Sequence, residues 1–315
     1  MADTILITTS SFGRFDETPL KALRDAGFHV VINPHGRKLT EAEAEALNRE
    51  HHPVGILAGV EPLTRTVMAA GGRLRAIARC GIGMDSVDSE AARALRIDVT
   101  NTPDAPTQAV AEITLGAILC MLRGIHSSCA AIRAGKWERP MGALLSFRTV
   151  GLLGMGRIGS RLAELLAPFG CRILGHDPHA DAPHGVEQVE FPQLLAESDV
   201  LSLHIPFSEA TRHIIGRDAI RAMKPGARLV NYARGGLVDE AALDQALTDG
   251  HLAGAALDCF ENEPYSGPLT RHESVVLTGH VGSYAREGRI IQETQAAHNL
   301  LASLAAERGG SGSKS

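Results

Sequence analysis

The sequence predicts an α/β protein made of two domains, each containing a parallel sheet. The chain has 315 residues, which is more than one typical compact core accommodates. Short apolar segments alternate with amphipathic segments along most of the chain, and this alternation is typical of strands joined by helices. Hydrophobic residues make up 44% of the sequence and charged residues 21%, which is the balance of a globular protein.

The first series of elements lies before residue 100. Gly27 follows an amphipathic segment at the position of a helix C-cap, and an apolar segment begins directly after it. The pattern predicts helices at 19–26 and 41–49 and strands at 4–8, 28–32, 54–58 and 75–78. A helix predicted at 286–305 can return to this region, so we expect a discontinuous first domain of residues 1–100 and 285–315.

The second series follows a break at residues 101–103, where Pro103 disfavours a helical conformation at the residue before it. A long apolar helix is predicted at 108–123. Six strands are then predicted at 149–153, 172–176, 200–204, 228–231, 254–257 and 275–277. Because helices lie between most of these strands, the pattern indicates a doubly wound domain over residues 101–284.

Composition excludes several classes of partner. The net charge of −5 comes from mixed acidic and basic residues without a basic stripe, which argues against nucleic acid. No apolar run is long enough to cross a bilayer and residues 1–10 lack the features of a secretory signal, so we expect no membrane partner. The five cysteines form no CxxC pair, which favours free thiols in a reducing cytoplasm. The 14 histidines show no metal-ligand spacing, so no metal is expected.

The strongest local motif is a GxGxxG pattern within the segment TVGLLGMGRIG, between an apolar strand and an amphipathic helix. Gly154 permits the tight turn after the strand, and Gly156 lets the backbone approach a pyrophosphate. Gly159 lets the helix lie close to the strand. The N–H groups of Arg157 and Ile158 would face the pyrophosphate at the positive end of the helix dipole.

An acidic residue stands at the distance that this motif requires. Asp177 follows the strand predicted at 172–176, where a carboxylate accepts hydrogen bonds from both ribose hydroxyls of adenosine. The same charge repels a 2′-phosphate, so the sequence favours NAD over NADP. The alternative is a structural glycine turn with Asp177 as a surface acid.

Candidate reaction residues stand at the carboxyl ends of later strands, where ligands bind in such sheets. Arg234 lies between small residues and fits a substrate carboxylate and carbonyl. His280 follows the last strand, and imidazole exchanges protons near neutral pH. Glu263 is the expected partner that raises its pKa, and Glu261 is the alternative. Asp258 ends a strand and could meet a nicotinamide or form an ordinary turn.

These residues together resemble the D-isomer-specific 2-hydroxyacid dehydrogenases, over about residues 8–301. The glycine motif and the pairs Asp177-Pro178 and Glu263-Pro264 carry the resemblance in the order and spacing of that family. Further matches are Arg79-Cys80-Gly81-Ile82-Gly83, Asn101-Thr102-Pro103, Val110-Ala111-Glu112, Ser202-Leu203-His204-Ile205-Pro206, Ala233-Arg234-Gly235-Gly236, Asp258 and His280-Val281-Gly282-Ser283.

The resemblance implies two Rossmann-like domains, a flavodoxin-like substrate domain and a doubly wound NAD-binding domain, with a cleft between them. It implies an enzyme that uses NAD on a small anionic 2-hydroxy or 2-oxo acid, and a homodimer through the NAD-binding domains. It implies a catalytic triad of Arg234, Glu263 and His280. The residues implied in binding are Cys80, Gly81 and Ile82 for the substrate carboxylate, and Pro206, Thr211, Ala233 and Asp258 for the cofactor.

Within the family the chain is most similar to the phosphoglycerate dehydrogenase branch, in a short form without regulatory domains. Arg79 stands where that branch places an arginine near a substrate phosphate, although Ala58 supplies no second charge. The resemblance therefore favours a phosphorylated acid such as 3-phosphoglycerate. Two alternatives stay open, a dehydrogenase of a phosphonate or other phosphorus oxyanion, and a non-enzymatic NAD-sensing corepressor.

Overall fold

The structure is a computed structural model that describes residues 2–310, with side chains described for residues 2–306. Contacts divide the chain into two compact units, here called unit 1 (Met1–Pro106 and Tyr284–Ser315) and unit 2 (Thr107–Ser283). The domain boundaries predicted from the sequence fall at residues 100 and 284. The last part of the predicted first domain, residues 311–315, lies outside the described residues.

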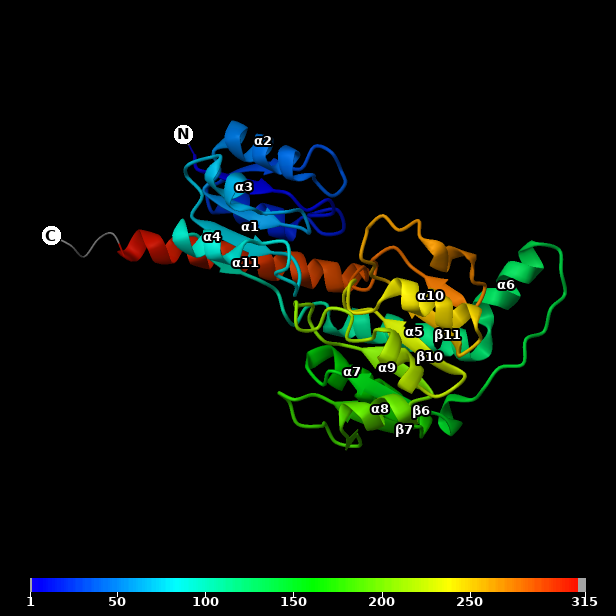
Figure 1. Ribbon diagram of the computed structural model, residues 1–315. Helices are drawn as coiled ribbons and strands as arrows, with labels where there is room; N and C mark the ends of the chain where they lie inside the picture. Colours follow the sequence, from blue (N-terminus) through cyan, green and yellow to red (C-terminus); the bar gives the residue numbers. More distant parts are fainter. Residues whose placement is uncertain (1, 311–315) are drawn as a thin grey trace. The chain divides into compact units, whose positions relative to one another are not determined.

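Unit 1 contains a five-stranded parallel sheet in the order β2-β1-β3-β4-β5 (Figure 1). This is the strand order of flavodoxin-like domains. The strands are β1 (Thr4–Ile7), β2 (His29–Ile32), β3 (Gly55–Ala58), β4 (Ala76–Arg79) and β5 (Asp98–Thr100). The helices are α1 (Thr18–Asp25), α2 (Glu41–His51), α3 (Arg65–Ala69), α4 (Ser89–Ala94) and α11 (Arg286–Gly310).

Local sequence explains where the elements of unit 1 begin and what they bury. The Thr40 hydroxyl accepts a hydrogen bond from the Glu43 N–H while the Glu43 carboxylate accepts from the Thr40 N–H, a capping box that starts α2. All four residues of β3 and of β4 are buried, as expected for inner strands of a parallel sheet. Helix α11 packs on β3 and β4, where Leu300 and Leu304 lie close to Gly55.

Unit 2 contains a seven-stranded parallel sheet in the order β12-β11-β10-β9-β6-β7-β8. The strand order reverses between β6 and β9, and ligands of doubly wound sheets bind at this kind of switch point. The strands are β6 (Thr149–Leu153), β7 (Arg172–His176), β8 (Glu187–Gln188), β9 (Val200–Leu203), β10 (Ala227–Asn231), β11 (Leu252–Leu257) and β12 (Val275–Leu277).

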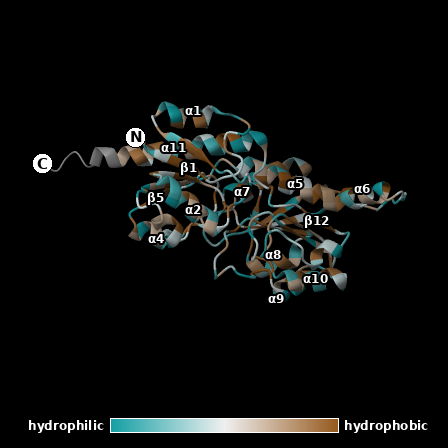
Figure 2. Cartoon of the chain, turned by 90° about the horizontal axis from the view of Figure 1, so that it is seen from above, coloured by the Kyte–Doolittle hydropathy of each residue, from teal (hydrophilic) through white to brown (hydrophobic). Residues whose placement is uncertain are grey.

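The α-helices of unit 2 are α5 (Thr107–Arg123), α6 (Ile125–Arg133), α7 (Arg157–Leu166), α8 (Phe191–Glu197), α9 (Arg217–Ala222) and α10 (Glu240–Thr248). Short 3-10 helices are η1 (Leu145–Phe147), η2 (Ala167–Phe169) and η3 (Pro268–Arg271). Helix α5 packs against α7 and contributes Ile118 and Leu122 to the core, and Figure 2 shows its apolar character.

Among the described helices none is long and apolar enough alone to cross a membrane. The pair α5–α6 reaches that length only with a bend of 67°.

The predicted α/β architecture with two parallel sheets is confirmed. All six strands predicted for the second sheet are present, and the long helix predicted at 108–123 corresponds to α5. Two strands were not predicted. These are β5, which has three residues, and β8, which has two.

Candidate active site

The glycine motif forms the turn between β6 and α7, at the switch point of the unit 2 sheet. Gly154 has φ +99°, and a Cβ there would lie 2.7 Å from the carbonyl oxygen of His204. A Cβ on Gly156 would meet no atom within 4 Å, so the backbone faces open space at this position. A Cβ on Gly159 would lie 2.1 Å from the carbonyl oxygen of Gly154, so only glycine lets α7 start this close to the turn.

This turn fits a dinucleotide pyrophosphate. Gly156 is the N-cap of α7 and provides no side chain to cap it, and the first N–H groups of a helix have no acceptors within the helix itself. The open space beside Gly156 is where an anion can reach those donors. The residues present therefore fit the pyrophosphate of NAD.

Asp177 follows β7 and lies beside the glycine turn. Its carboxylate accepts hydrogen bonds from the Met155 N–H and the His179 N–H, each at 2.8 Å. The side chain is half-buried and is held at the edge of the turn, where the predicted contact with the adenosine ribose requires it. No arginine stands within two residues of Asp177, which agrees with the preference for NAD.

The loop after β9 contains two of the predicted cofactor residues. The Thr211 hydroxyl donates to the Pro206 carbonyl at 3.0 Å and accepts from the Ser208 N–H at 2.8 Å. The structure thus shows Thr211 shaping the loop that begins at Pro206. Their contact with cofactor remains a prediction.

Arg234 follows β10 in a turn that Asn231 builds. The Asn231 side chain accepts from the Ala233 N–H at 3.1 Å and donates to the Arg234 carbonyl at 2.8 Å. The guanidinium of Arg234 donates to the Ala233 carbonyl at 2.7 Å. A Cβ on Gly235 would lie 1.9 Å from the Phe260 carbonyl oxygen, so glycine is required after Arg234.

Glu263 and His280 form the central pair of the site. His280 Nδ1 lies 3.0 Å from Glu263 Oε2, and the Phe260 N–H donates to Glu263 Oε1 at 3.1 Å. The pair brings together residues that are 17 positions apart in the chain. Because Glu263 occupies Nδ1, the other ring nitrogen, Nε2, is the one available to exchange a proton with a substrate.

Glu261, the alternative partner of His280, contacts a different histidine. Its carboxylate lies 2.6 Å from His213 Nε2, and its N–H donates to Glu240 at 2.8 Å. The structure therefore pairs His280 with Glu263 and gives Glu261 to His213. This second Glu–His pair provides a matched comparison for experiments on the first.

The surroundings of His280 favour its protonated form. Hydrogen bonding to Cys259 and to Glu263 raises the pKa of His280 to about 10, against the opposing effect of burial.

The loop that carries His280 is fixed by Asp258, whose side chain is 1% exposed. Its carboxylate accepts from the Val281 N–H at 2.8 Å and from the Gly282 N–H at 2.7 Å. It also accepts from the Thr278 hydroxyl at 2.5 Å, while the Asp258 carbonyl accepts from the His280 N–H at 2.9 Å. His280 has φ +55°, and these bonds hold the strained loop in place. The predicted role of Asp258 at the nicotinamide remains a prediction.

The predicted substrate residues belong to unit 1. Arg79 ends β4 and is 8% exposed, and its guanidinium donates to the carbonyl of Cys80. The Cys80 N–H donates to Ala58 at 2.8 Å, and the Gly81 N–H donates to the Thr102 hydroxyl at 2.9 Å. Two of the amides expected to hold a carboxylate thus already have partners within unit 1. The Ile82 carbonyl accepts from Asn101 at 2.8 Å.

The structure adds two residues that sequence analysis did not assign to the site. Asn231 is 1% exposed and shapes the turn of Arg234, but in the sequence it is only the last residue of a strand. Cys259 is 2% exposed and lies with Glu263 and His280, although the sequence shows it as one of five scattered thiols. A polar residue at the end of a predicted parallel strand was the available signal for Asn231, whereas the sequence offered none for Cys259.

Comparison with known proteins gives the same picture of unit 2. The profile of the protein family described as "D-isomer specific 2-hydroxyacid dehydrogenase, NAD binding domain" matches residues 115–282. This range includes the glycine motif, Asp177, Arg234, Glu263 and His280.

Individual relatives extend the similarity over most of the chain. A glyoxylate reductase of Aeropyrum pernix is 43% identical over 245 residues, which are 73% of this chain and 73% of the relative. A D-3-phosphoglycerate dehydrogenase of Methanocaldococcus jannaschii is 39% identical over 78% of this chain but only 48% of its own length. The chain thus spans about half of that relative. The crystal structure of the TT0316 protein from Thermus thermophilus superposes with a TM-score of 0.89 at 37% identity, covering 96% and 97% of the two chains.

Proposed function

The chain belongs to the family of D-isomer-specific 2-hydroxyacid dehydrogenases, and we propose that it exchanges a hydride between NAD and the 2-carbon of a small D-2-hydroxy acid. The observation that carries this proposal is the Glu263–His280 pair at 3.0 Å, in the unit that also holds the glycine turn and Asp177. When bound, NAD accepts the hydride in oxidation, and its reduced form returns the hydride in reduction.

Residues of unit 2 transfer the proton, orient the imidazole and bind the substrate. His280 Nε2 takes the hydroxyl proton as the 2-carbon loses its hydride, and returns that proton in the reverse reaction. Glu263 orients the ring and stabilises the imidazolium that forms. Arg234 binds the substrate carboxylate and polarises the 2-carbonyl oxygen through its forked N–H donors. Strands β10, β11 and β12 are neighbours, so their carboxyl ends bring these groups to one edge of the sheet.

The test of this mechanism is His280→Ala. Loss of the proton acceptor should lower kcat by roughly 10²–10⁴-fold and leave NAD affinity little changed. His213→Ala is the matched control, because it removes a histidine that also contacts a glutamate but stands outside the proposed mechanism. Near wild-type turnover in His280→Ala, measured as NADH formation, rules out the assigned role.

The names of the compared relatives bear on the alternatives. The relative from Aeropyrum pernix is named a reductase and the relative from Methanocaldococcus jannaschii a dehydrogenase. Both names favour an enzyme over a corepressor. Neither name supports oxidation of a phosphonate, which we do not carry further. The relatives differ in substrate, since glyoxylate carries no phosphate and 3-phosphoglycerate does.

The finer proposal concerns the group beyond the 2-carbon. Arg79 supports a phosphorylated acid such as 3-phosphoglycerate, because a guanidinium binds phosphate well. Its guanidinium is buried and donates to the Cys80 carbonyl, so it must turn outward to bind a ligand. An unphosphorylated acid, as in the reduction of glyoxylate or hydroxypyruvate, makes no such demand and is the second candidate.

A direct comparison decides between the two candidates. The ratio of kcat/KM for 3-phosphoglycerate to that for D-glycerate is measured in the wild type and in Arg79→Met. A phosphate site at Arg79 predicts a ratio well above one that falls by about tenfold or more in the variant, since a charge-assisted hydrogen bond contributes about 1.5–3 kcal/mol. An unchanged ratio would favour the unphosphorylated acid.

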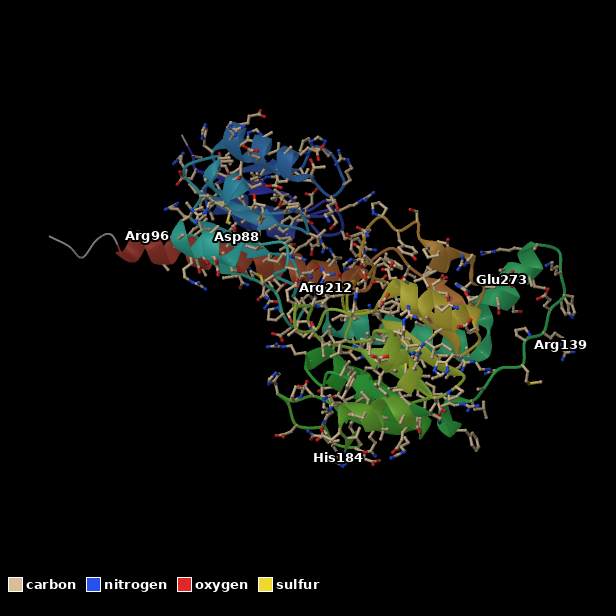
Figure 3. The ribbon with its side chains drawn as sticks, viewed as in Figure 1. Asp88, Arg96, Arg139, His184, Arg212 and Glu273 are labelled. Atoms are coloured by element: carbon tan, nitrogen blue, oxygen red, sulfur yellow. The ribbon has the colours of Figure 1, made fainter. Side chains whose placement is uncertain are left out.

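We further propose that two copies of the chain form a homodimer through unit 2. Helix α6 and the segment 134–144 after it project from the rest of the unit, and Arg139 marks this segment (Figures 1 and 3). They expose apolar side chains, with Trp137 83% and Met141 98% accessible and Ile125, Ile132 and Leu144 half or more exposed. Exposed apolar surface of this kind is typical of a protein interface.

A cytoplasmic location is also part of the proposal. All five cysteines are free thiols, as expected in a reducing compartment. Cell fractionation tests this, and recovery of the protein with secreted or membrane fractions would contradict it.

A further inference from the structure

Three side chains with metal-binding atoms meet beside the carboxyl ends of β11 and β12. The sulfur of Cys259, a carboxylate oxygen of Glu263 and a ring nitrogen of His280 all lie within 4.8 Å of one another. In the part of the chain that the structure describes, this is the one group of three such residues. No spacing pattern in the sequence indicated it, because His280 joins the other two only through the parallel pairing of β11 with β12.

We propose that Cys259, Glu263 and His280 bind Zn²⁺ and that the bound ion inhibits the enzyme. The inhibitory part rests on the proposed function, in which His280 exchanges the substrate proton. One sulfur, one nitrogen and one oxygen ligand form a donor set that zinc accepts, with the fourth tetrahedral position left to water. The thiolate discriminates against Mg²⁺ and Ca²⁺, which prefer oxygen ligands.

The distances fit such an ion after small rotations of side chains. Zinc–nitrogen bonds of about 2.0 Å and zinc–oxygen bonds of about 2.1 Å place the nitrogen and oxygen atoms roughly 3.4 Å apart in a tetrahedral site. His280 Nδ1 and Glu263 Oε2 are already 3.0 Å apart. Glu263 and His280 expose 32% and 42% of their side chains, so an ion can reach them from solvent. Cys259 is the buried ligand of the three.

The backbone around the cluster is fixed in advance. Asp258 holds the loop of His280 through the N–H groups of Val281 and Gly282, and the Phe260 N–H positions Glu263. The thiol of Cys259 lies 3.5 Å from the Ala233 carbonyl. Ligands that are held in place before binding lose little conformational freedom when the ion arrives.

Inhibition follows from which ring nitrogen the ion occupies. Zinc releases two protons to solvent, one from the thiol of Cys259 and one from Nδ1 of the imidazolium, so the remaining ring proton stays on Nε2. In that state His280 cannot accept the proton that a hydroxy acid releases. The ion also takes the place of the hydrogen bond between His280 and Glu263.

Metal binding is tested first without turnover. The full chain is treated with a chelator and then titrated with Co²⁺, whose thiolate complexes show a charge-transfer band in the near ultraviolet. The wild type should show this band at one equivalent, and Cys259→Ala and Cys259→Ser should lose it. Glu263→Gln should weaken binding while the band remains at saturation.

Two cysteine variants serve as matched controls. Cys120 lies 3.8 Å from His126 Nδ1, and Cys129 is exposed, so Cys120→Ala and Cys129→Ala each remove a thiol that is more accessible than that of Cys259. Both should keep the band. A band that persists in both Cys259 variants, or that disappears in Cys120→Ala, overturns the assignment, as does its absence from the wild type.

Zinc inhibition is measured next, relative to the zinc-free rate of each variant. The concentration that halves turnover should rise by about tenfold or more in Cys259→Ala and remain unchanged in both controls. Equal inhibition of Cys259→Ala and the wild type refutes the inhibitory site.

The proposed function and the proposed metal site can be refuted independently of each other. A chain that binds Co²⁺ through Cys259 but turns over no hydroxy acid refutes the function, and an active chain without the band refutes the metal site.

Discussion

At the residue scale, the proposed chemistry depends on how one imidazole is held. Glu263 contacts His280 at Nδ1, and Asp258 fixes the backbone on which His280 stands. The first contact affects the charge of the ring, and the second affects its position. Variants of Glu263 should therefore change the pH dependence of the rate more than the geometry of the site.

Replacing Glu263 with glutamine should lower the pKa of His280 from its raised value of about 10. Reduction needs the imidazolium, so its rate falls as the pH rises through this pKa. Oxidation needs neutral imidazole, so its rate rises over the same range. In Glu263→Gln the fall in the rate of reduction and the rise in the rate of oxidation should both occur at lower pH. The pH profiles of kcat/KM measure this, with Glu261→Gln as the control because Glu261 contacts His213.

The same shift has a consequence for folding. A histidine whose pKa is higher in the folded than in the unfolded state stabilises the fold fully below the unfolded value of about 6.5. That contribution is lost as the pH rises through the folded pKa of about 10. Unmoved pH profiles in Glu263→Gln would contradict both the assigned contact and this linkage.

Asp177→Ala should weaken NAD binding and relax the exclusion of NADP, because the carboxylate that accepts from ribose and repels a 2′-phosphate is gone. Each ribose hydrogen bond to a charged group contributes about 1.5–3 kcal/mol, so the loss of two predicts a decrease in affinity of roughly 100-fold or more. Asp181→Ala is the control, since Asp181 is exposed nearby in the chain. Fluorescence titration measures the affinities, and an unchanged preference between NAD and NADP would disprove the ribose contact.

The sequence predicted the pairing of Glu263 with His280, but it did not predict how the side chains of Arg79 and Cys259 are placed. Glu263 and His280 were predicted to meet because each follows a strand of one parallel sheet. The orientation of Arg79 toward the Cys80 carbonyl was not predictable, because a side-chain rotamer depends on packing around β4. The place of Cys259 beside His280 was missed for a similar reason, since a buried thiol has no sequence pattern of its own.

At the scale of the element, glycine decides how closely α7 approaches β6. A Cβ at Gly159 would lie 2.1 Å from the Gly154 carbonyl oxygen, so Gly159→Ala must displace the turn. We expect a loss of about 1–3 kcal/mol in the free energy of unfolding, as for other overpacked sites, together with weaker NAD binding.

The matched control is Gly116→Ala in α5. A Cβ at Gly116 meets no atom within 4 Å, so alanine should stabilise the helix by up to about 1 kcal/mol. Urea denaturation of both variants measures the difference. Equal stability of Gly159→Ala and the wild type would show that the turn does not need this glycine.

Element length explains which strands were predicted. The six strands predicted in unit 2 carry apolar runs such as Thr149–Leu153, and the structure confirms them. Strands β5 and β8 have only three and two residues, and neither contains a buried residue. They form because a neighbouring strand offers hydrogen-bonding groups, which is information that a local pattern does not contain.

At the scale of the whole molecule, the exposed apolar surface of α6 and segment 134–144 predicts association. Ile132→Glu combined with Trp137→Glu should convert a dimer into a monomer, because burying two carboxylates in an interface is costly. Sedimentation velocity measures the mass. Ile291→Glu is the control, since Ile291 is an exposed apolar residue of unit 1. A monomeric wild type would contradict the proposed dimer.

The hydrogen bonds between Asp258 and the His280 loop also determine which positions of the loop tolerate substitution during evolution. Asp258 contacts peptide N–H groups at positions 281 and 282, which every residue except proline provides. Side chains at 279 and 281 can therefore drift without releasing His280, whereas a Cβ at Gly282 would lie 3.0 Å from the carboxylate. Positions 279 and 281 are free to vary in side-chain identity while one buried aspartate preserves the path of the loop.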